Sequence, residues 1–293
     1  MGTILMGGLE LGLILAVMAI GMFLSFKILN IPDLTVDSSF TLGCAVSAIG
    51  AANGHPVLGF LLSVLAGMAA GCVTGFLQTK LKIQPILAGI LTMTGLYSVN
   101  LWVMGDKPNI PLFGKATIFT PLQGKLPVLF EKLPVIALVL IAVAVLIRLF
   151  LKTQIGMSLR ATGDNEDMVR ASSINSDGMK ILGLALSNGI VALSGALMAQ
   201  YQSFSDISAG IGMMVIGLAS IIVGDAFVGK GSVGRGMLAA ILGAVIYRFI
   251  LTFALQLRMP LSGLKLLSAL LVVLAISIAA ARDALAKRRM RNA

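Results

Sequence analysis

The chain has 293 residues, of which 58% are hydrophobic and 12% are charged, and its mean hydropathy is +1.00. A soluble domain carries about a quarter charged residues, so the composition excludes an ordinary soluble protein. The net charge of +10 is what cytoplasmic loops rich in Lys and Arg give a membrane protein, and we expect no nucleic-acid partner. One histidine, with Cys44 and Cys72 inside apolar runs, predicts neither a metal site nor a disulfide framework.

Nine apolar segments follow one another along the chain. They cover about 4–26, 35–52, 56–79, 84–104, 134–151, 180–202, 208–229, 234–254 and 262–281. Most of them approach the roughly 20 residues that cross a bilayer as a helix. The apolar runs are continuous, whereas strands of a membrane barrel alternate apolar and polar residues. We therefore predict an all-α polytopic transmembrane bundle of about 8–10 spans, forming a single domain over residues 1–293.

The second segment begins with an unusually polar stretch. Six polar or helix-breaking residues fall within eight positions, namely Pro32, Asp33, Thr35, Asp37, Ser38 and Ser39. A lipid-facing helix would leave these groups without partners, so we predict a non-helical entry that is buried in protein or lines a path. Two roles stay open for Asp37: contact with a cationic group of a solute, or capping of its own helix. The segment at 208–229 is rich in glycine and is also expected to be interrupted.

Further polar residues of the spans are candidates for the translocation path. The full set is Thr35, Asp37, Ser38, Thr92, Thr94, Tyr97, Asn100, Ser187 and Asn188. Helical spacing places Tyr97 and Asn100 on one face with Met93. Such residues are as often hydrogen-bonding partners between helices as ligands of a solute. In the third segment, Gly67, Gly71 and Gly75 repeat every four residues, which predicts one face that packs closely against another helix.

Four charged residues fall inside the apolar segments, where charge is costly. We expect Arg248 and Lys265 to extend to an interface and Glu10 to reach the outer surface. Asp225 is expected to pair with Lys230 or Arg235. The spacing of these four residues along the chain does not indicate a proton relay.

The distribution of Lys and Arg predicts the orientation in the membrane. With the N-terminus outside, fifteen of these residues fall in inner loops and the tail, against five in outer loops. Because positive charge accumulates on the cytoplasmic side, the polar loop 152–180 and the basic tail 282–293 are predicted to be cytoplasmic. The outer loop at about 105–133 then offers a surface for an extracytoplasmic partner, or is a plain solvated loop.

The polar loop contains signals for a short helix. Asp164 or Asn165 can cap its N-terminus, and Glu166 and Asp167 then occupy the first turn, where the helix dipole favours negative charge. Met168 and Val169 give the helix a small apolar face, and Gly178 is expected to end it. These features are typical of a docking element, although an ordinary interhelical loop remains an alternative.

Three stretches of the chain resemble a known family. Residues 156–175 read Gly-Met-Ser-Leu-Arg-Ala-Thr-Gly-Asp-Asn-Glu-Asp-Met-Val-Arg-Ala-Ser-Ser-Ile-Asn. They resemble the coupling-loop signature of ATP-binding-cassette (ABC) importer permeases of the branched-chain amino acid and ribose type, with Ser173 in place of the usual Gly before Ile174. Residues 32–38 and 229–236 are similar to two further motifs of that family, with Asp37 in place of a Gly. Among its members, the chain looks closest to permeases for tryptophan or tyrosine uptake.

The resemblance implies an importer permease subunit of the prokaryotic inner membrane that moves a small organic solute, such as an amino acid. Implied partners are cytoplasmic ABC ATPases, an extracytoplasmic solute-binding protein, a second permease copy in a homodimer, and membrane lipid. The residues implied to contact the ATPase are Gly156, Arg160, Gly163, Asp164, Asn165, Glu166, Asp167, Arg170 and Ile174. An ion-coupled secondary transporter is the alternative.

The chain itself is not expected to be an enzyme. Residues 224–230 fit the first seven positions of a P-loop, but Gly231 stands where a magnesium-binding hydroxyl is required. We therefore expect this chain to bind no cofactor, and ATP and Mg²⁺ to be bound by the ATPase partner.

Overall fold

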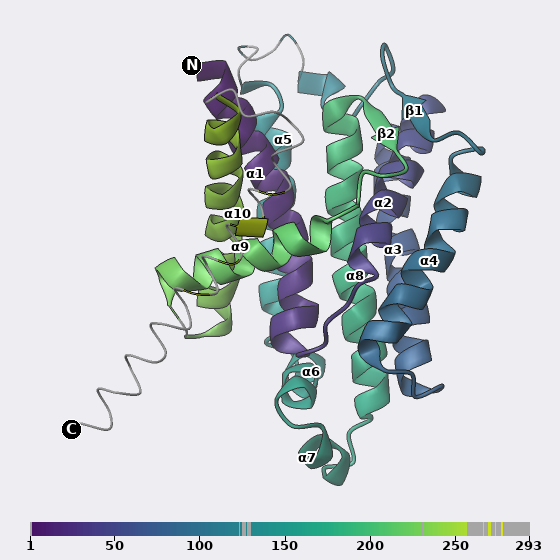
Figure 1. The fold of residues 1–293 in the computed structure, drawn as a ribbon, viewed down its shortest axis with the longest axis vertical. Coiled ribbons are helices and arrows are strands. Elements are labelled where there is room, and N and C mark those ends of the chain that lie inside the picture. The colour runs from purple at the N-terminus through teal and green to yellow at the C-terminus, as the bar shows by residue number, and fades with distance from the viewer. Residues whose placement is uncertain are drawn as a thin grey trace, which may run out of the picture.

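A computed structural model describes residues 2–122, 124, 127, 130–229 and 231–256, together with positions 266, 269, 270, 273 and 277. The ninth predicted segment, 262–281, lies largely outside the described residues, as do Lys265 and the basic tail. Figure 1 shows the helices standing side by side, with the connections gathered at two opposite ends.

The long helix α8 (Ser176–Gln202) lies in the centre of the bundle. On one side it packs against α2 (Val36–Ala52) and α3 (Pro56–Thr79), and α4 (Pro85–Val103) covers them. On the other side lies α1 (Gly2–Met22), which continues as a π-helix, η1 (Phe23–Ile28). Helices α5 (Leu133–Phe150), α9 (Met213–Val228) and α10 (Val233–Gln256) surround α1. The main apolar core lies where α1, α8 and α5 meet.

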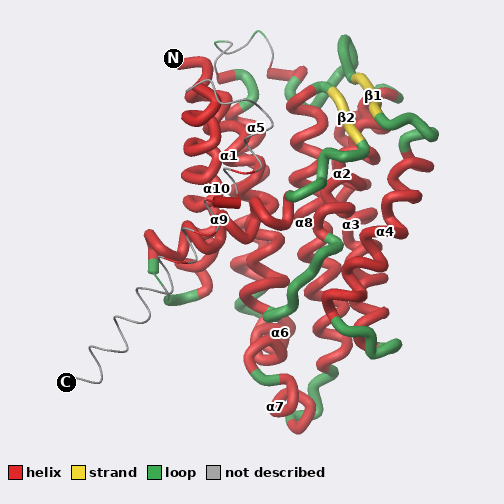
Figure 2. The backbone as a smooth tube through the Cα atoms, viewed as in Figure 1, coloured by secondary structure: helices red, strands yellow, loops and turns green. Residues whose placement is uncertain are grey.

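Short elements mark the two ends of the bundle. At the upper end in Figure 2, β1 (Asn109–Pro111) pairs antiparallel with β2 (Phe204–Asp206), and Ile110 lies opposite Ser205. A 3-10 turn, η2 (Thr120–Leu122), lies in the same connection as β1. At the lower end, α6 (Gln154–Asp164) and α7 (Glu166–Ala171) project below the bundle.

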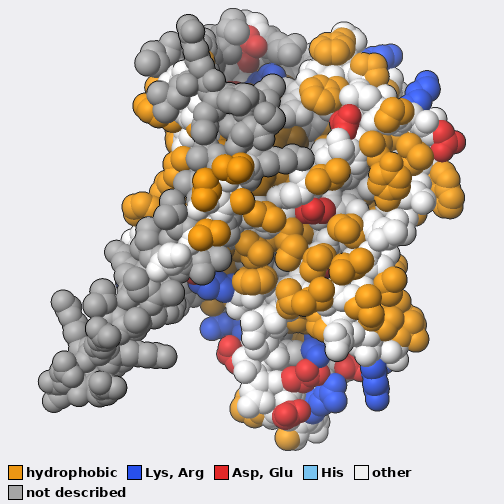
Figure 3. Space-filling model, viewed as in Figure 1, with side chains coloured by type: hydrophobic (Ala, Val, Ile, Leu, Met, Phe, Trp, Pro, Cys, Tyr) orange, Lys and Arg blue, Asp and Glu red, His pale blue; other side chains and the backbone are white. Residues whose placement is uncertain are grey.

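Six described helices are long and apolar enough to cross a membrane: Ile4–Ile28, Pro56–Thr79, Pro85–Val103, Leu133–Phe150, Ser176–Gln202 and Val233–Gln256. Two shorter apolar helices, α2 and α9, accompany them. Figure 3 shows apolar side chains over the middle of one face, while charged side chains gather around α6 and α7 at the lower end. The prediction of a polytopic helical membrane protein is confirmed.

The polar entry to the second segment is non-helical, as predicted. Residues 30–33 form no regular element, whereas Asp37, Ser38 and Ser39 already belong to α2, which begins at Val36, well above the lower ends of α1 and α8. The seventh segment begins late but is not interrupted, because α9 continues through Gly217 and Gly224. Its first residues form turns, so that α9 begins only at Met213 and runs across the bundle instead of along it. Both short helices therefore begin inside the structure.

Three glycines bring α3 against α8. A methyl group at Gly71 would lie 2.2 Å from the carbonyl oxygen of Leu184, and one at Gly67 would lie 2.5 Å from the carbonyl oxygen of Asn188. At Gly75 it would lie 2.7 Å from the Cα of Ile181. No side chain fits at these distances, so the two backbones touch along this face.

Candidate functional site

Helix α6 is fastened to the lower end of the bundle through two glycines of the predicted coupling loop. The hydroxyl of Thr153 caps the helix by accepting the backbone N–H of Gly156 at 3.2 Å. A methyl group at Gly156 would lie 2.2 Å from the carbonyl oxygen of Phe150 in α5, and one at Gly163 would lie 1.9 Å from that of Ile28 in η1. These two positions hold α6 against α5 and η1.

Helix α7 follows α6 after a single residue. The side chain of Asn165 caps it by accepting the backbone N–H of Met168 at 3.1 Å, so Asn165 is the cap and Asp164 is not. Glu166 and Asp167 occupy the first turn as predicted, where the free N–H groups and the helix dipole favour their charge. The polar loop thus holds two helices, where the sequence suggested one.

The predicted end of the coupling helix at Gly178 is wrong. Helix α7 ends at Ala171, because Ser173 takes a left-handed conformation with φ of 60° and turns the chain. This is the position where the resembling family has Gly, which adopts that conformation without strain. Gly178 instead lies in the first turn of α8, and its N–H donates to the capping side chain of Asn175 at 3.0 Å.

Ion pairs join α7 to α8. The carboxylate of Glu166 accepts hydrogen bonds from Lys180 Nζ at 2.6 Å and from Arg170 Nη2 at 2.8 Å. Asp177 lies 3.5 Å from Arg170 and 3.9 Å from Lys80 at the end of α3. The hydrogen bond from Lys180, with the positive charges of Lys180 and Arg170, lowers the pKa of the Glu166 carboxyl below its usual range.

The remaining predicted coupling residues differ in how far their side chains are exposed to solvent. Ile174 is half-buried. By contrast, Arg160, Asp164 and Asp167 are exposed and form no salt bridge within the described part of the chain. The apolar side chain of Met168 is 57% exposed on α7. Met168 and Asp167 are thus neighbouring exposed residues of α7.

The carboxylate of Asp37 has a role that neither sequence interpretation anticipated. It lies in the first turn of α2 and accepts the backbone N–H of Gly212 at 2.9 Å and that of Met214 at 2.7 Å. Asp37 therefore caps α9, a different helix. The contact is tight, because a methyl group at Gly210 would lie 1.8 Å from the carbonyl oxygen of Asp37.

Most predicted path residues make hydrogen bonds between helices. Thr35 bonds Thr74 at 2.8 Å, Ser187 donates to the carbonyl of Gly21 at 2.8 Å, and Ser38 donates to that of Met93 at 2.9 Å. These bonds tie α2 and its entry to α3 and α4, and α8 to α1. Thr92 donates to the carbonyl of Ala88 in its own helix.

The shared face predicted for Tyr97 and Asn100 is wrong. Asn100 is 1% exposed and donates to the carbonyl of Ser38 at 3.2 Å, whereas Tyr97 is 55% exposed. Thr94 is exposed as well and bonds the carbonyl of Ile90 in its own helix. Three residues turn the helix by about 300°, which leaves the two side chains about 60° apart around its axis. Because α4 buries only one narrow face, this difference is enough to bury Asn100 and expose Tyr97.

Two predictions for charged residues are corrected. Asp225 pairs with Lys27 of η1, and among the described residues it forms no ion pair with Arg235; Lys230 lies outside the described residues. Glu10 is buried and accepts a hydrogen bond from the Tyr201 hydroxyl at 2.9 Å, so it does not reach the outer surface. Both partners lie more than 190 positions away in sequence, beyond the reach of local patterns.

One buried acid was missed as a site residue. Asp33 is 2% exposed, and its carboxylate accepts Asn188 Nδ2 at 2.6 Å and the backbone N–H of Thr35 at 2.9 Å. These bonds fix the extended entry to α2 against the middle of α8. Among the described residues, no group of three or more His, Cys, Asp or Glu side chains could hold a metal ion.

Several known proteins are similar in sequence to this chain over most of its length. A tyrosine transport system permease protein of Clostridioides difficile is 43% identical over 263 residues, covering 89% of this chain and 86% of the relative. An uncharacterised protein of Rickettsia prowazekii is 32% identical over 281 residues, 94% of this chain and 97% of the relative. An autoinducer 2 import system permease protein of Yersinia enterocolitica is 31% identical over 269 residues, 88% of this chain and 71% of the relative. No solved structure matches the chain.

Residues 4–278 also match a family described as the permease component of branched-chain amino acid transport systems. The match includes the coupling loop, both short helices and the central helix α8. It favours a permease of an ABC import system over the ion-coupled alternative. The chain therefore belongs to the family of branched-chain amino acid transport system permease components, and it is a multi-pass protein of the bacterial inner membrane.

Proposed function

We propose that this permease imports an amino acid that an extracytoplasmic binding protein delivers, and that separate cytoplasmic ATPases drive it by docking on α6 and α7. The observation that carries the proposal is the surface of α7. This capped helix lies below the bundle, bears exposed Met168 and unpaired Asp167, and is joined to α8 through Glu166.

The connection from α7 to α8 supports a mechanical role. Helix α8 is the central helix of the bundle and touches α1, α2 and α3. A displacement of α7 by an ATPase would therefore act on α8 through Lys180 and Arg170. Because α3 and α8 touch backbone to backbone, they would move together. ATP hydrolysis and Mg²⁺ binding belong to the ATPase in this proposal.

An amino acid is the proposed solute class because the relative named for tyrosine transport is 43% identical over most of both chains. The path is proposed to pass the beginnings of α2 and α9, where Asp37 lies half-exposed inside the apolar segments. A carboxylate facing lipid is unfavourable, so water or a second permease copy is expected to cover it. Homodimerisation is part of this proposal.

At the opposite end, the connection with β1 supplies a surface for the binding protein. Phe113 is 78% exposed beside a pocket of about 450 Å³ whose lining includes Lys115 and Lys132. An exposed aromatic residue next to unburied lysines suits contact with a protein surface.

The test combines charge reversal at Arg160 and Asp167 in a permease reconstituted with its ATPase and binding protein. Both side chains are exposed and without salt bridges in the described structure, so Arg160→Glu with Asp167→Lys keeps the net charge and breaks no ion pair. Thermal stability of the variant is measured alongside, because a lysine in the first turn of α7 opposes the helix dipole. We expect weaker ATPase retention and uptake of labelled tyrosine at least about tenfold lower, since a few unpaired charges at an interface amount to more than 1.4 kcal/mol.

The matched control is Lys107→Glu with Asp106→Lys, an exposed pair at the other end of the molecule. It should leave ATPase retention at the level of the unaltered protein. Full assembly and uptake in the Arg160 and Asp167 variant would refute docking on α7. Saturable uptake of a sugar instead of tyrosine would refute the proposed solute class alone.

A further inference from the structure

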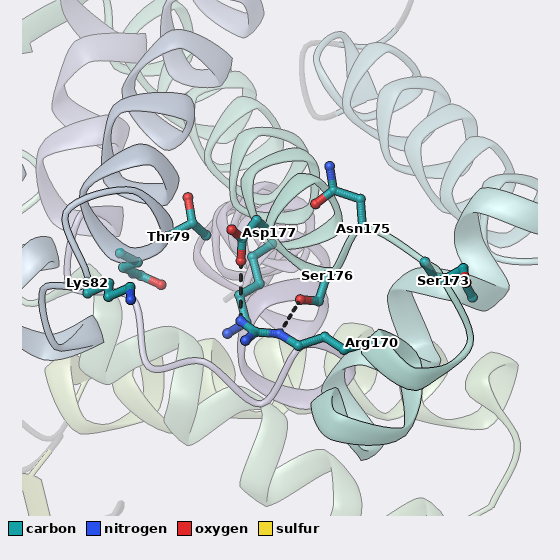
Figure 4. Close-up of a pocket in the computed structure, with 10 residues that line it drawn as sticks. Thr79, Lys82, Arg170, Ser173, Asn175, Ser176 and Asp177 are labelled. Atoms are coloured by element: carbon teal, nitrogen blue, oxygen red, sulfur yellow. Dashed lines mark hydrogen bonds and ion pairs between the residues drawn. The ribbon is translucent and has the colours of Figure 1, made fainter.

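A polar pocket of about 650 Å³ lies between the end of α3 and the junction of α7 with α8. Its lining includes Gln78, Thr79 and Lys82 on one side and Arg170, Ser176, Asp177 and Lys180 on the other. Figure 4 shows Lys82 facing Arg170 and Asp177 across the pocket. The pocket shares Arg170 and Lys180 with the proposed connection from α7 to α8, whereas its other side, with Gln78 and Lys82, has no role in that proposal.

The pocket carries an excess of positive charge. Its acidic neighbours are already paired: Glu166 with Lys180 and Arg170, and Asp177 with Arg170 and Lys80. Lys82 forms no salt bridge within the described part of the chain, so its charge is left for a ligand. The charges around the pocket therefore suit an anion.

Lys82 is placed there at a conformational cost. The backbone N–H of Ile83 bonds the carbonyl of Leu77 at 3.2 Å, so the chain turns back on the end of α3 at Lys82. Lys82 indeed has φ of 55°, a left-handed conformation that non-glycine residues rarely take. A glycine would take this conformation without strain, so the backbone at this position does not require a lysine.

Gln78 adds an unsatisfied donor beside the pocket. Both terminal atoms of its amide are buried and have no hydrogen-bond partner. Buried amides are nearly always hydrogen-bonded, because an unpaired one has lost its water without compensation. A rotation of the Gln78 side chain would present its Nε2 donor to a group held by Lys82.

The surroundings place the pocket at the membrane surface. Leu81, between Lys80 and Lys82, is 58% exposed, and Phe76 and Ile86 on the adjoining helices are also exposed. Apolar residues next to lysines at the ends of membrane helices are typical of the headgroup region, where acyl chains and phosphates lie close together.

We propose that this pocket binds the phosphate group of an anionic phospholipid, with Lys82 as the main determinant and Arg170, Lys180 and Gln78 as further donors. A free phosphate offers the same chemistry, but it would leave the exposed Leu81 and Phe76 without a partner. The bound headgroup would bridge the α3–α4 connection to the α7–α8 junction. Such a bridge would restrain α7 in anionic membranes.

The experiment measures lipid binding to the full chain purified in neutral detergent, by native mass spectrometry. Phosphatidylglycerol, phosphatidylcholine and inorganic phosphate are titrated separately. The informative variant is Lys82→Gly, which removes the charge and suits the left-handed backbone. We expect unchanged or higher thermal stability and roughly fivefold weaker phosphatidylglycerol binding, the effect of one lysine near an anionic headgroup. Lys152→Ala, an exposed lysine at the same end, is the control and should change binding less than about twofold.

Each outcome decides the proposal. Preference for phosphatidylglycerol over phosphatidylcholine that falls in Lys82→Gly and persists in Lys152→Ala supports it. Equal losses in the two variants would show a general charge effect and overturn the site. Binding of inorganic phosphate that is as tight as that of phosphatidylglycerol would overturn the lipid assignment, and no binding of either would overturn both. The measurement needs no ATPase, so its failure is separate from failure of the proposed function.

Discussion

At the scale of single residues, Asp37 shows how an acid can be kept inside an apolar segment. Its two carboxylate oxygens accept one backbone N–H each from the beginning of α9, at 2.9 and 2.7 Å. The first N–H groups of a helix have no partners within that helix and carry partial positive charge. The carboxylate and the helix end thus compensate each other, and this bond fixes where α9 enters the bundle.

Asp37→Asn should loosen α9. The amide keeps one acceptor but places an NH₂ group against the second backbone N–H, and the charge is lost. We expect the free energy of unfolding to fall by about 1–2 kcal/mol, the usual worth of a charged cap. Amide exchange at Gly212 and Met214 should accelerate. Asp206→Asn, at the end of β2 and away from α9, is the control. Unaltered exchange at those two amides would show that Asp37 does not hold α9.

Glu166 gives the α7–α8 junction a defined pH dependence. The pKa of its carboxyl is lowered in the folded protein, first by the hydrogen bond from Lys180. The stabilisation is therefore fully present above the usual pKa of 4.5 and is lost as the pH falls through the lowered folded value. Amide exchange in α7, corrected for the intrinsic rate, should stay slow down to pH below 4.5.

Lys180→Met removes the largest cause of that shift. In this variant, α7 should lose protection at a higher pH than in the unaltered protein, closer to the usual range of glutamate. Identical pH profiles for the two proteins would mean that the ion pair does not stabilise the junction.

At the scale of elements, the contact between α3 and α8 depends on the absence of side chains. Gly71→Ala would place a methyl group 2.2 Å from a carbonyl oxygen of α8, so the helices would have to separate. We expect a loss of about 1–3 kcal/mol of unfolding free energy, typical of overpacking, read as a lower melting temperature in detergent. Gly95→Ala in α4 meets no atom within 4 Å and should stabilise the helix slightly. Equal melting temperatures for the two variants would contradict this account of the contact.

The two short helices α2 and α9 are the other elements that we connect with transport. The entry to α2 is fixed by Asp33 and Asn188, the beginning of α9 by Asp37, and its far end by the pairing of Asp225 with Lys27. Helix α9 is thus held at its beginning by two hydrogen bonds to Asp37, near its far end by the ion pair with Lys27, and along its length by packing against α10. The path is proposed to pass the beginnings of α2 and α9, so this is where we expect it to open.

At the scale of the whole molecule, features that depend on the spacing of residues close together in the chain could be predicted from the sequence. The spans follow from continuous apolar runs, the Asn165 cap from its place before two acids, and the close face of α3 from glycines four residues apart. Contacts between distant segments could not be predicted. Asp37 and Met214 are 177 positions apart, and Lys27 and Asp225 are 198 apart. Nothing local to either residue specifies its partner.

The central claim is that α7 is the surface on which the ATPase acts. A photo-crosslinking amino acid at Met168, which is 57% exposed, tests it in living cells. We expect a covalent adduct with an ABC ATPase at position 168, and none with that ATPase at Phe113 on the opposite end. An adduct at Phe113 and not at 168, or an ATPase that copurifies without any adduct at 168, would contradict it.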